Sequence, residues 1–378
     1  MKRTLRWAGP ILASGALLLL PWGCYAARPT RALDLAIVDK TVPFANRLEH
    51  RSLYWLLRHR KVVQPDGRAY DSARDYLGAF PGPTPGDPPA RTTELTPPRA
   101  VEADLVYLVD TYGVYEEDLA SGAEMKAALE RSPKIYGGLA TAEVDAVERA
   151  IAAGVPVVAE FNAFASPTGA LERERMERML GVRWTHWVGR YFGGLDDPAE
   201  VPRWLVRVWE REHGLRWEFR GAGYVVTRDD TECEVLRTES ELERIGLTIE
   251  RERPVDPLIR AAHDGVGYGY WFDVVEAAPG AATLASYAWH ATPVGRARLE
   301  ARGLPARFPA IVRAPAARAW YFAGDFADNP MPEGERPFAG WLALRKTTES
   351  LRLAPSVDGF YWRFYAPLVD ALLDEAER

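Results

Sequence analysis

The sequence predicts an α/β protein in which helices cover both faces of a parallel sheet and the C-terminal half is rich in β-strands. In the first half, short wholly apolar segments alternate with amphipathic ones, a pattern typical of strands buried on both sides. After residue 217, apolar and aromatic runs separated by glycine, proline and charged turns predict further strands. The chain has 378 residues, 47% hydrophobic and 26% charged, so it can bury a sizeable core. This composition excludes a largely disordered chain, a coiled coil and a multi-pass membrane protein.

The predicted elements follow in chain order. In the first half they are a strand at 33–38, a helix at 52–60, a strand at 101–109, a helix from a capping Thr141 to Gly154, a strand at 155–159 and a helix at 171–180 closed by Gly181. In the second half they are strands at 223–227, 234–236, 268–275, 283–289, 310–312 and 320–322 and a helix at 360–377 with Pro367 in its first turn. Seven prolines within 81–98 predict a long surface loop.

Four parts follow from this organisation. Residues 1–30 form an N-terminal membrane or signal segment, and 31–222 form the α/β core with its loop at 81–98. Residues 223–330 are the β-rich part that completes or extends this core, and 331–378 are a C-terminal helical segment.

The N-terminal segment predicts the location of the protein. Residues 7–27 contain no charge, and three basic residues precede them, which favours a single membrane helix with the body outside the cytoplasm. An uncleaved signal anchor is the first interpretation, a lipoprotein acylated at Cys24 the second, and a secretory peptide cleaved after Ala26 the third. All three predict an extracytoplasmic body held by, or exported through, the cell membrane.

Charge and motifs limit the partners and cofactors. Residues 1–30 contain four of the 47 basic residues and none of the 53 acidic ones, so the acidic body is a poor nucleic-acid binder. Neither G-x-G-x-x-G nor G-x-x-x-x-G-K occurs, so nucleotide binding is unsupported. His-Glu-x-x-His and Cys-x-x-Cys are also absent, and Glu49 and His50 are adjacent on a predicted helix and so lie on different faces. We therefore expect no metal and no cofactor.

Three segments carry a resemblance to a known superfamily. ADLVYLVDTYGVY, YGGLATAEVDAVERAIAAGVPVVAEFNAF and the pair ATLASYAW and ARAWYFAGDFAD resemble the class I glutamine amidotransferase-like fold, in the non-catalytic form found in the trimerisation domain of some β-galactosidases. The resemblance covers 33–190 and 265–328 and implies a flavodoxin-like, amidotransferase-like sheet. The beginning LAIVDKTVP also resembles an uncharacterised family of membrane-anchored bacterial proteins. Homo-oligomer formation stays open.

The superfamily's catalytic residues are missing here. Active members place a cysteine nucleophile on the turn after a strand, but that turn reads Ala159-Glu160-Phe161-Asn162-Ala163. None of the six histidines is followed two positions later by glutamate. Cys233 is expected to be a small apolar residue inside a strand, since its neighbours Glu232 and Glu234 would raise the pKa of its thiol. Glutamine hydrolysis is therefore excluded.

Carboxylates gather where the predicted strands end. The candidates for acid/base chemistry are Asp39, Asp110, Glu160 and Asp325, and the accompanying candidates for substrate binding are Lys40, Tyr112, Asn162 and Asp328. In an open α/β sheet the ligand crevice lies at these ends. Two carboxylates in one cleft act as acid and base in glycoside cleavage. The alternative is that each side chain only caps the helix or turn that follows.

Aromatic residues give a second indication of carbohydrate. Trp184, Trp187 and Tyr191 fall at helical spacing, which predicts a helix face packed into the core. The alternative is a platform on which sugar rings stack, with Arg190 donating two hydrogen bonds to an acidic sugar. Arg190 could instead pair with a surface aspartate.

Three functional hypotheses follow. The first is a membrane-anchored, extracytoplasmic amidotransferase-like protein without the triad that binds cell-envelope or other carbohydrate. The second is a hydrolase of glycans that uses two of the strand-end carboxylates. The third is a scaffold that contacts partner proteins through its β-rich half.

Overall fold

A computed structural model describes residues 19–42, 44–84, 86–119, 132–164, 167–238, 240–329, 337–350 and 357–378. The strands are β1 (Arg31–Ala32), β2 (Leu35–Asp39), β3 (Val62–Val63), β4 (Leu77–Phe80), β5 (Arg91–Thr92), β6 (Leu105–Asp110), β7 (Val114–Tyr115), β8 (Lys134–Tyr136), β9 (Val157–Ala159), β10 (Val182–Phe192), β11 (Gly223–Arg228), β12 (Glu232–Arg237), β13 (Leu242–Arg251), β14 (Val266–Gly267), β15 (Phe272–Ala277), β16 (Ala282–Ala291), β17 (Arg307–Arg313) and β18 (Ala319–Phe322). The helices are α2 (Leu48–His59), α3 (Pro97–Glu102), α4 (Glu116–Leu119), α6 (Thr141–Ala152), α7 (Ala170–Leu180), α8 (Arg203–His213), α9 (Pro293–Ala301), α10 (Trp341–Ser350), α11 (Val357–Phe360) and α12 (Ala366–Ala376), with a 3₁₀ turn η1 (Pro257–Ile259) and a π-helical turn η2 (Tyr361–Tyr365).

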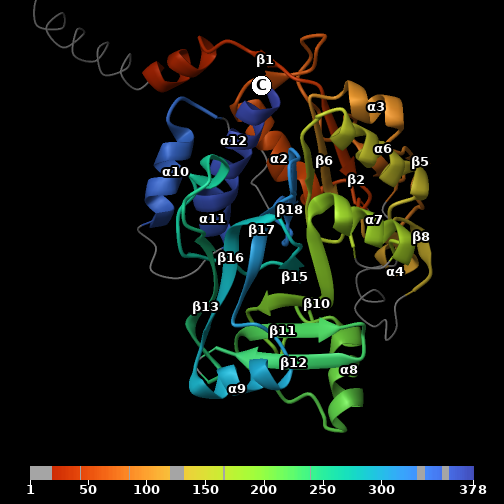
Figure 1. Cartoon of the computed structure of the whole chain (residues 1–378), viewed down its shortest axis with the longest axis vertical. Coiled ribbons are helices and arrows are strands. Elements are labelled where there is room, and N and C mark those ends of the chain that lie inside the picture. The colour runs from red at the N-terminus through yellow and green to blue at the C-terminus, as the bar shows by residue number, and fades with distance from the viewer. Residues whose placement is uncertain are drawn as a thin grey trace, which may run out of the picture.

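A ten-stranded sheet forms the centre of the protein (Figure 1). Its middle consists of five parallel strands in the order β4-β2-β6-β9-β18, and antiparallel strands extend it on both sides. Along the chain this order is 2-1-3-4-5, the flavodoxin-like arrangement. The order reverses between β2 and β6, so the crevice expected for a ligand lies beyond the ends of these two strands.

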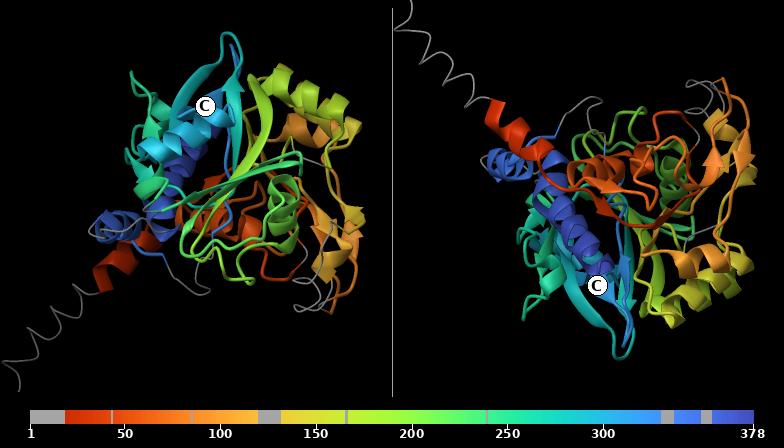
Figure 2. Two further views of the ribbon diagram at one scale, coloured as in Figure 1. Left: turned by 90° about the horizontal axis from the view of Figure 1, so that it is seen from below. Right: turned by 90° about the horizontal axis from the view of Figure 1, so that it is seen from above.

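Helices cover both faces of the parallel strands because those strands are apolar on both sides. Every residue of β2 and β6 is buried. Figure 1 places α3, α6 and α7 on one side and α2 and α12 on the other, and Figure 2 shows the same division from below and above. The predicted α/β fold, with helices over a sheet containing parallel strands and a strand-rich C-terminal half, is confirmed.

A second, antiparallel sheet has the order β12-β11-β10-β15. It has its own hydrophobic cluster with α8, which includes Phe192, Leu205, Trp209 and Val235. The sheet lies beyond the carboxyl ends of the parallel strands (Figure 1). It therefore faces the crevice that the strand order predicts.

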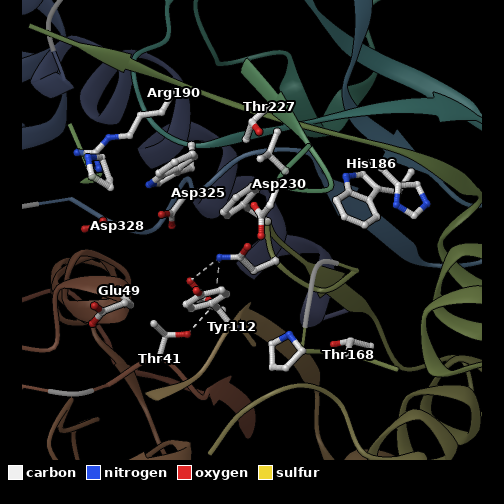
Figure 3. Close-up of a pocket in the computed structure, with 18 of the residues that line it drawn as sticks. Thr41, Glu49, Tyr112, Thr168, His186, Arg190, Thr227, Asp230, Asp325 and Asp328 are labelled. Atoms are coloured by element: carbon white, nitrogen blue, oxygen red, sulfur yellow. Dashed lines mark hydrogen bonds between the residues drawn. The ribbon is translucent and has the colours of Figure 1, made fainter. Parts of the chain in front are cut away.

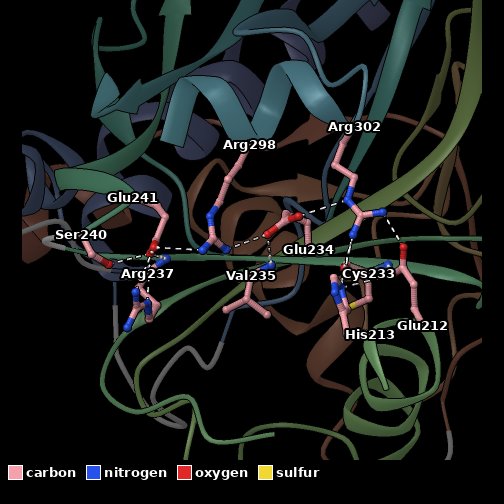
Figure 4. Close-up of polar contacts among 10 residues, drawn as sticks. All are labelled: Glu212, His213, Cys233, Glu234, Val235, Arg237, Ser240, Glu241, Arg298 and Arg302. Carbon is pink, nitrogen blue, oxygen red and sulfur yellow. Dashed lines mark hydrogen bonds and ion pairs between the residues drawn. The ribbon is translucent and has the colours of Figure 1, made fainter. Parts of the chain in front are cut away.

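Ion pairs join this second sheet to α9 (Figure 4). Arg302, just beyond α9, donates to Glu234 of β12 at 3.1 Å and also pairs with Glu212 of α8. Arg298 of α9 donates to Glu234 at 3.0 Å. Because Glu234 is buried, these guanidinium groups compensate a charge that would otherwise be costly, and they fix the sheet to the body.

Several local predictions are wrong. The helix face expected at Trp184 and Tyr191 is the long strand β10, whose Val, Thr and aromatic residues favour a pleated surface. The strand expected at 101–109 begins at Leu105, because Pro97 starts the short helix α3. Thr141 is not the cap of α6, where Ala140 holds that position and its N–H donates to Glu143 at 3.0 Å.

The expected N-terminal anchor lies only partly within the described residues, since 1–18 fall outside them. Residues 19–26 are helical, and the indole of Trp22 packs on Phe338 with ring centroids 5.1 Å apart. Among the described residues, no helix has the length and apolar character needed to cross a membrane. The segment lies at the end of the protein opposite α8 and the second sheet (Figure 1).

Candidate functional site

A pocket of about 600 Å³ lies between the ends of the parallel strands and the second sheet (Figure 3). We call its two sides the floor and the roof. The floor consists of Thr41, Glu49, Asp110, Tyr112, Asn162, Asp325 and Asp328. The roof consists of Trp184, His186, Val188, Arg190, Pro202, Trp204, Thr227, Asp229, Asp230 and Trp271. The volume lies within the range usual for small-molecule sites.

The floor is built around the switch point between β2 and β6. Asp110 ends β6, and its Oδ1 accepts hydrogen bonds from Thr41 Oγ1 at 2.7 Å and from the Tyr112 N–H at 2.6 Å. Within the described part of the chain, its Oδ2 accepts a hydrogen bond only from the Asn162 amide, at 3.3 Å. Burial, and secondly the charge of Asp39, raise the pKa of Asp110 to about 7. One carboxylate oxygen thus stays accessible to a ligand on a group that titrates near neutral pH.

Asp39 lies behind this floor and supports it. It is fully buried, accepts a hydrogen bond from the Thr41 N–H at 2.9 Å and lies 2.6 Å from His50 Nδ1. His50 Nε2 lies 2.9 Å from the Ser72 carbonyl, which can only accept, so Nε2 carries a proton. Asp39 and His50 Nδ1 therefore share one further proton in a buried pair that fixes Thr41 beside Asp110.

The turn after β9 positions Asn162. This residue has a φ of 68°, a left-handed conformation that is uncommon for non-glycine residues, and its side chain faces Asp110. The carbonyl of Asn162 accepts from Thr111 Oγ1 at 2.8 Å, which holds the turn against β6. A strained residue at a pocket edge is a frequent feature of functional sites.

Glu160 supports the floor from within the core and does not line the pocket. Its Oε2 accepts from the N–H groups of Phe326 and Ala327 at 2.8 and 2.9 Å, and Tyr107 donates to its Oε1. Burial raises the pKa of Glu160 to about 8 against the effect of these donors, which lowers it. Glu160 thereby fixes the backbone between Asp325 and Asp328.

Three further carboxylates lie together at one end of the pocket. Figure 3 shows Glu49, Asp325 and Asp328 there, with His186 and Thr168 at the other end. Burial raises the pKa of each. The charge of Asp328 raises the pKa of Glu49 and Asp325 further, and the charge of Asp39 raises that of Asp328. For Asp328, the charges of Arg190 and Arg51 act in the opposite direction. Repulsion of this kind favours protonation or a cationic partner.

The roof presents its polar residues from irregular backbone. The pairing of β10 with β15 shifts register between Trp184 and Val188, and His186 within this bulge has a φ of 70°. Asp229 and Asp230 both have positive φ in the three-residue turn between β11 and β12. His186 Nδ1 lies 2.8 Å from Asp229 Oδ1, so the bulge and the turn meet at the pocket.

Aromatic rings line both sides of the pocket. Trp184, Trp204 and Trp271 contribute from the roof, and Tyr112 and Phe161 lie near the strand ends. The rings of Phe161 and Trp271 are nearly parallel, with centroids 6.3 Å apart. The guanidinium of Arg190 lies 5.6 Å from the Trp271 ring, a cation–π distance.

The predicted site residues divide into two groups. Those that line the pocket are Asp110, Tyr112, Asn162, Trp184, Arg190, Asp325 and Asp328, and those that do not are Asp39, Lys40, Glu160 and Trp187. Lys40 is buried, pairs with Glu143 and donates to the Gly138 carbonyl at 2.8 Å. Trp187 is buried on the opposite face of β10, below the Arg228 guanidinium.

Sequence reasoning missed most of the roof. His186, Trp204, Asp229, Asp230 and Trp271 all lie in a region where only Trp184, Trp187 and Arg190 were expected to be pocket residues. The sequence could have indicated a hairpin at Asp229 and Asp230, because aspartate tolerates positive φ and the pair lies between two segments that contain β-branched residues. Nothing local indicates that this hairpin returns to the strand ends.

Cys233 lies outside the pocket. It is fully buried in β12, and burial raises the pKa of its thiol well above the usual range. The His213 ring lies 3.1 Å from the Cys233 carbonyl oxygen. Among the described residues, no group of three or more His, Cys, Asp or Glu is arranged to hold a metal ion.

Comparisons with known proteins give a distant likeness in structure. No family model and no curated protein matches the chain. Among solved structures, the chain is similar to a ThuA-like protein from Bacteroides uniformis, with a TM-score of 0.38 and 9% identity over 80% of this chain and 86% of that one. A likeness at this level carries no weight for function, which we infer from the pocket alone.

Proposed function

We propose that the pocket binds carbohydrate. The observation that carries this proposal is that indole rings on the roof face carboxylates on the floor across one pocket. Sugar rings stack their apolar faces on aromatic side chains, while their hydroxyls donate to carboxylates and accept from arginine. Trp271 supplies such a ring, and Asp110 and Arg190 supply the polar groups.

The proposal also places the pocket outside the cell. The uncharged residues 7–27 after a basic flank support a membrane anchor with an extracytoplasmic body. The described end of this segment lies opposite the second sheet, so an anchored chain would turn its pocket away from the membrane (Figure 1). Cell-envelope glycans would be the accessible ligands. We further propose a distant amidotransferase-like origin, supported by the 2-1-3-4-5 strand order and the three resembling segments.

Binding of the full chain to an array of envelope and other glycans tests this function. We expect at least one glycan to bind, and Trp271→Leu to weaken it by about 10-fold because an aromatic stacking surface is lost. Trp217→Leu is the matched control, since Trp217 packs against the core of the second sheet and does not line this pocket. No binding to any glycan, or equal losses in the two variants, would refute a carbohydrate site.

A second candidate function is glycan hydrolysis. It is favoured by the Asp110 carboxyl, whose pKa of about 7 and accessible Oδ2 suit a general acid or base, with Asp325 as the second carboxylate. Asp110→Asn should then lower turnover of a bound glycan by about 10²–10⁴-fold while leaving its affinity nearly unchanged. Release of reducing ends measures this, and unchanged turnover would remove Asp110 from the chemistry.

A further inference from the structure

Asp325 is a buried carboxylate to which none of the described residues donates a hydrogen bond. It has 6% of its surface exposed, and that surface lines the pocket (Figure 3). No described residue donates a hydrogen bond to its side chain, although the Asp325 N–H is bonded to the Trp271 carbonyl. A buried charge without a partner is costly, and native proteins retain such groups mainly where a ligand or a reaction uses them.

The charges around Asp325 are of its own sign. After burial, the largest effects on it come from Asp328, Asp110, Glu160 and Glu49, all of which are acidic. Arg190, which lies over Trp271, and Arg51 act on Asp328 but are not among the main effects on Asp325. Negative charge is therefore in excess at this end of the pocket.

An organic cation would balance the negative charge at this end of the pocket better than a metal ion would. No group of three or more His, Cys, Asp or Glu among the described residues is arranged to hold a metal ion. An ammonium group has three donors, which suits several separated carboxylates. Aromatic rings of the same pocket would add a cation–π attraction.

We propose that Asp325 binds a protonated amine, with Asp328 and Asp110 beside it, so that the carbohydrate taken by this pocket is an amino sugar with a free amino group. This inference rests on the proposed carbohydrate function and makes it specific. An N-acetylated sugar has no charge at that nitrogen, so it would leave the carboxylates desolvated and unpaired.

Isothermal titration of the full chain with three probes tests the inference. The probes are a β-1,4-linked glucosamine tetramer, the corresponding N-acetylglucosamine tetramer, and spermidine as an amine without a sugar. At pH 7 the glucosamine tetramer is expected to bind about 10-fold or more tightly than its acetylated form, the size of one charge-assisted contact. Asp325→Asn should abolish this preference, and Glu300→Gln, which removes one exposed charge on α9, should retain it.

Each result separates the inference from the underlying function. Equal affinity for the two tetramers, or tighter binding of the acetylated one, overturns the amine site and leaves the carbohydrate pocket intact. If spermidine binds and neither tetramer does, the pocket binds amines that carry no sugar. That result refutes the amino-sugar inference and also counts against the proposed carbohydrate function. If Asp325→Asn does not fold, Asp328→Asn replaces it, and a preference unchanged in that variant also counts against the inference.

Discussion

The floor and the roof of the pocket differ in burial and in what positions their polar side chains. The floor carries carboxylates at the ends of buried parallel strands, held by hydrogen bonds to the backbone and to Thr41. The roof carries half-exposed His186 and an aspartate turn on an antiparallel sheet with a separate core. Burial changes the protonation of the floor, whereas backbone irregularity directs the side chains of the roof. Substitutions in the floor should therefore change the stability of the protein, and its dependence on pH, more than substitutions in the roof.

The largest expected effect is on the pH dependence of the floor. Because the pKa of Asp110 is raised to about 7 in the folded state, its contribution to stability is fully present below about pH 4 and is lost as the pH rises through about 7. Three pKa units correspond to at most about 4 kcal/mol. Asp110→Asn keeps the acceptor for Thr41 and Tyr112, so it should lose this part of the pH dependence.

Urea unfolding at pH 4.5, 6 and 8 measures the difference between the two proteins. Asp39 acts on this carboxyl, and Asp110 in turn raises the pKa of Glu49, Glu160 and Asp325, so the comparison measures Asp110 together with its effect on these three groups. Glu300→Gln serves as the surface control. If the stability of wild type and of Asp110→Asn changes with pH in the same way, the pKa of Asp110 is not raised towards 7 in the folded protein.

The next effect concerns the support beneath the floor. Glu160→Ala removes the acceptor of two buried N–H groups, those of Phe326 and Ala327, and should lower the free energy of unfolding by about 3 kcal/mol. Glu160→Gln keeps one acceptor oxygen and should cost less. Thermal and urea denaturation measure both. If the alanine variant is as stable as wild type, Glu160 does not fix the loop that carries Asp325.

Removing an ion pair that attaches the second sheet to the rest of the protein should give a smaller loss of stability. Arg302→Ala removes donors to Glu234 and to the Cys233 carbonyl, at 3.1 and 3.2 Å, while Arg298 still pairs with Glu234. We expect a loss of about 2 kcal/mol. Hydrogen exchange should show faster opening of β11 and β12 with unchanged protection of β2 and β6. Uniform loss of protection in both sheets would contradict a separately attached roof.

The smallest effect is expected at His186. Its pair with Asp229 is partly exposed, so His186→Ala should change stability by less than about 1 kcal/mol. His186→Gly should be no less stable than the alanine variant, because glycine adopts the φ of 70° without steric cost. A loss comparable to that of Glu160→Ala would remove the distinction between floor and roof.

Much of the floor was predictable because its signals are local. An apolar run buried on both faces and followed by a polar residue marks the end of a parallel strand, which placed Asp110, Asn162 and Asp325. The same reasoning could not separate Asp39 and Glu160, which support the floor, from Asp110 and Asp325, which line it. That difference depends on His50 and on the loop after β18, both distant in sequence.

The sequence by itself determined four of the five parallel strands, the helices α2, α6, α7 and α12 and the row of carboxylates, because each depends on neighbouring residues and on burial of apolar faces. It did not indicate β4 or α3. Only the tertiary structure decided that β10, β11 and β15 form a second sheet over those strand ends. Its pairs, such as Trp184 with Val275, join residues far apart in the chain, and many registers satisfy the same alternation of apolar and polar residues. The pocket has two sides only because these distant strands pair into a second sheet above the strand ends.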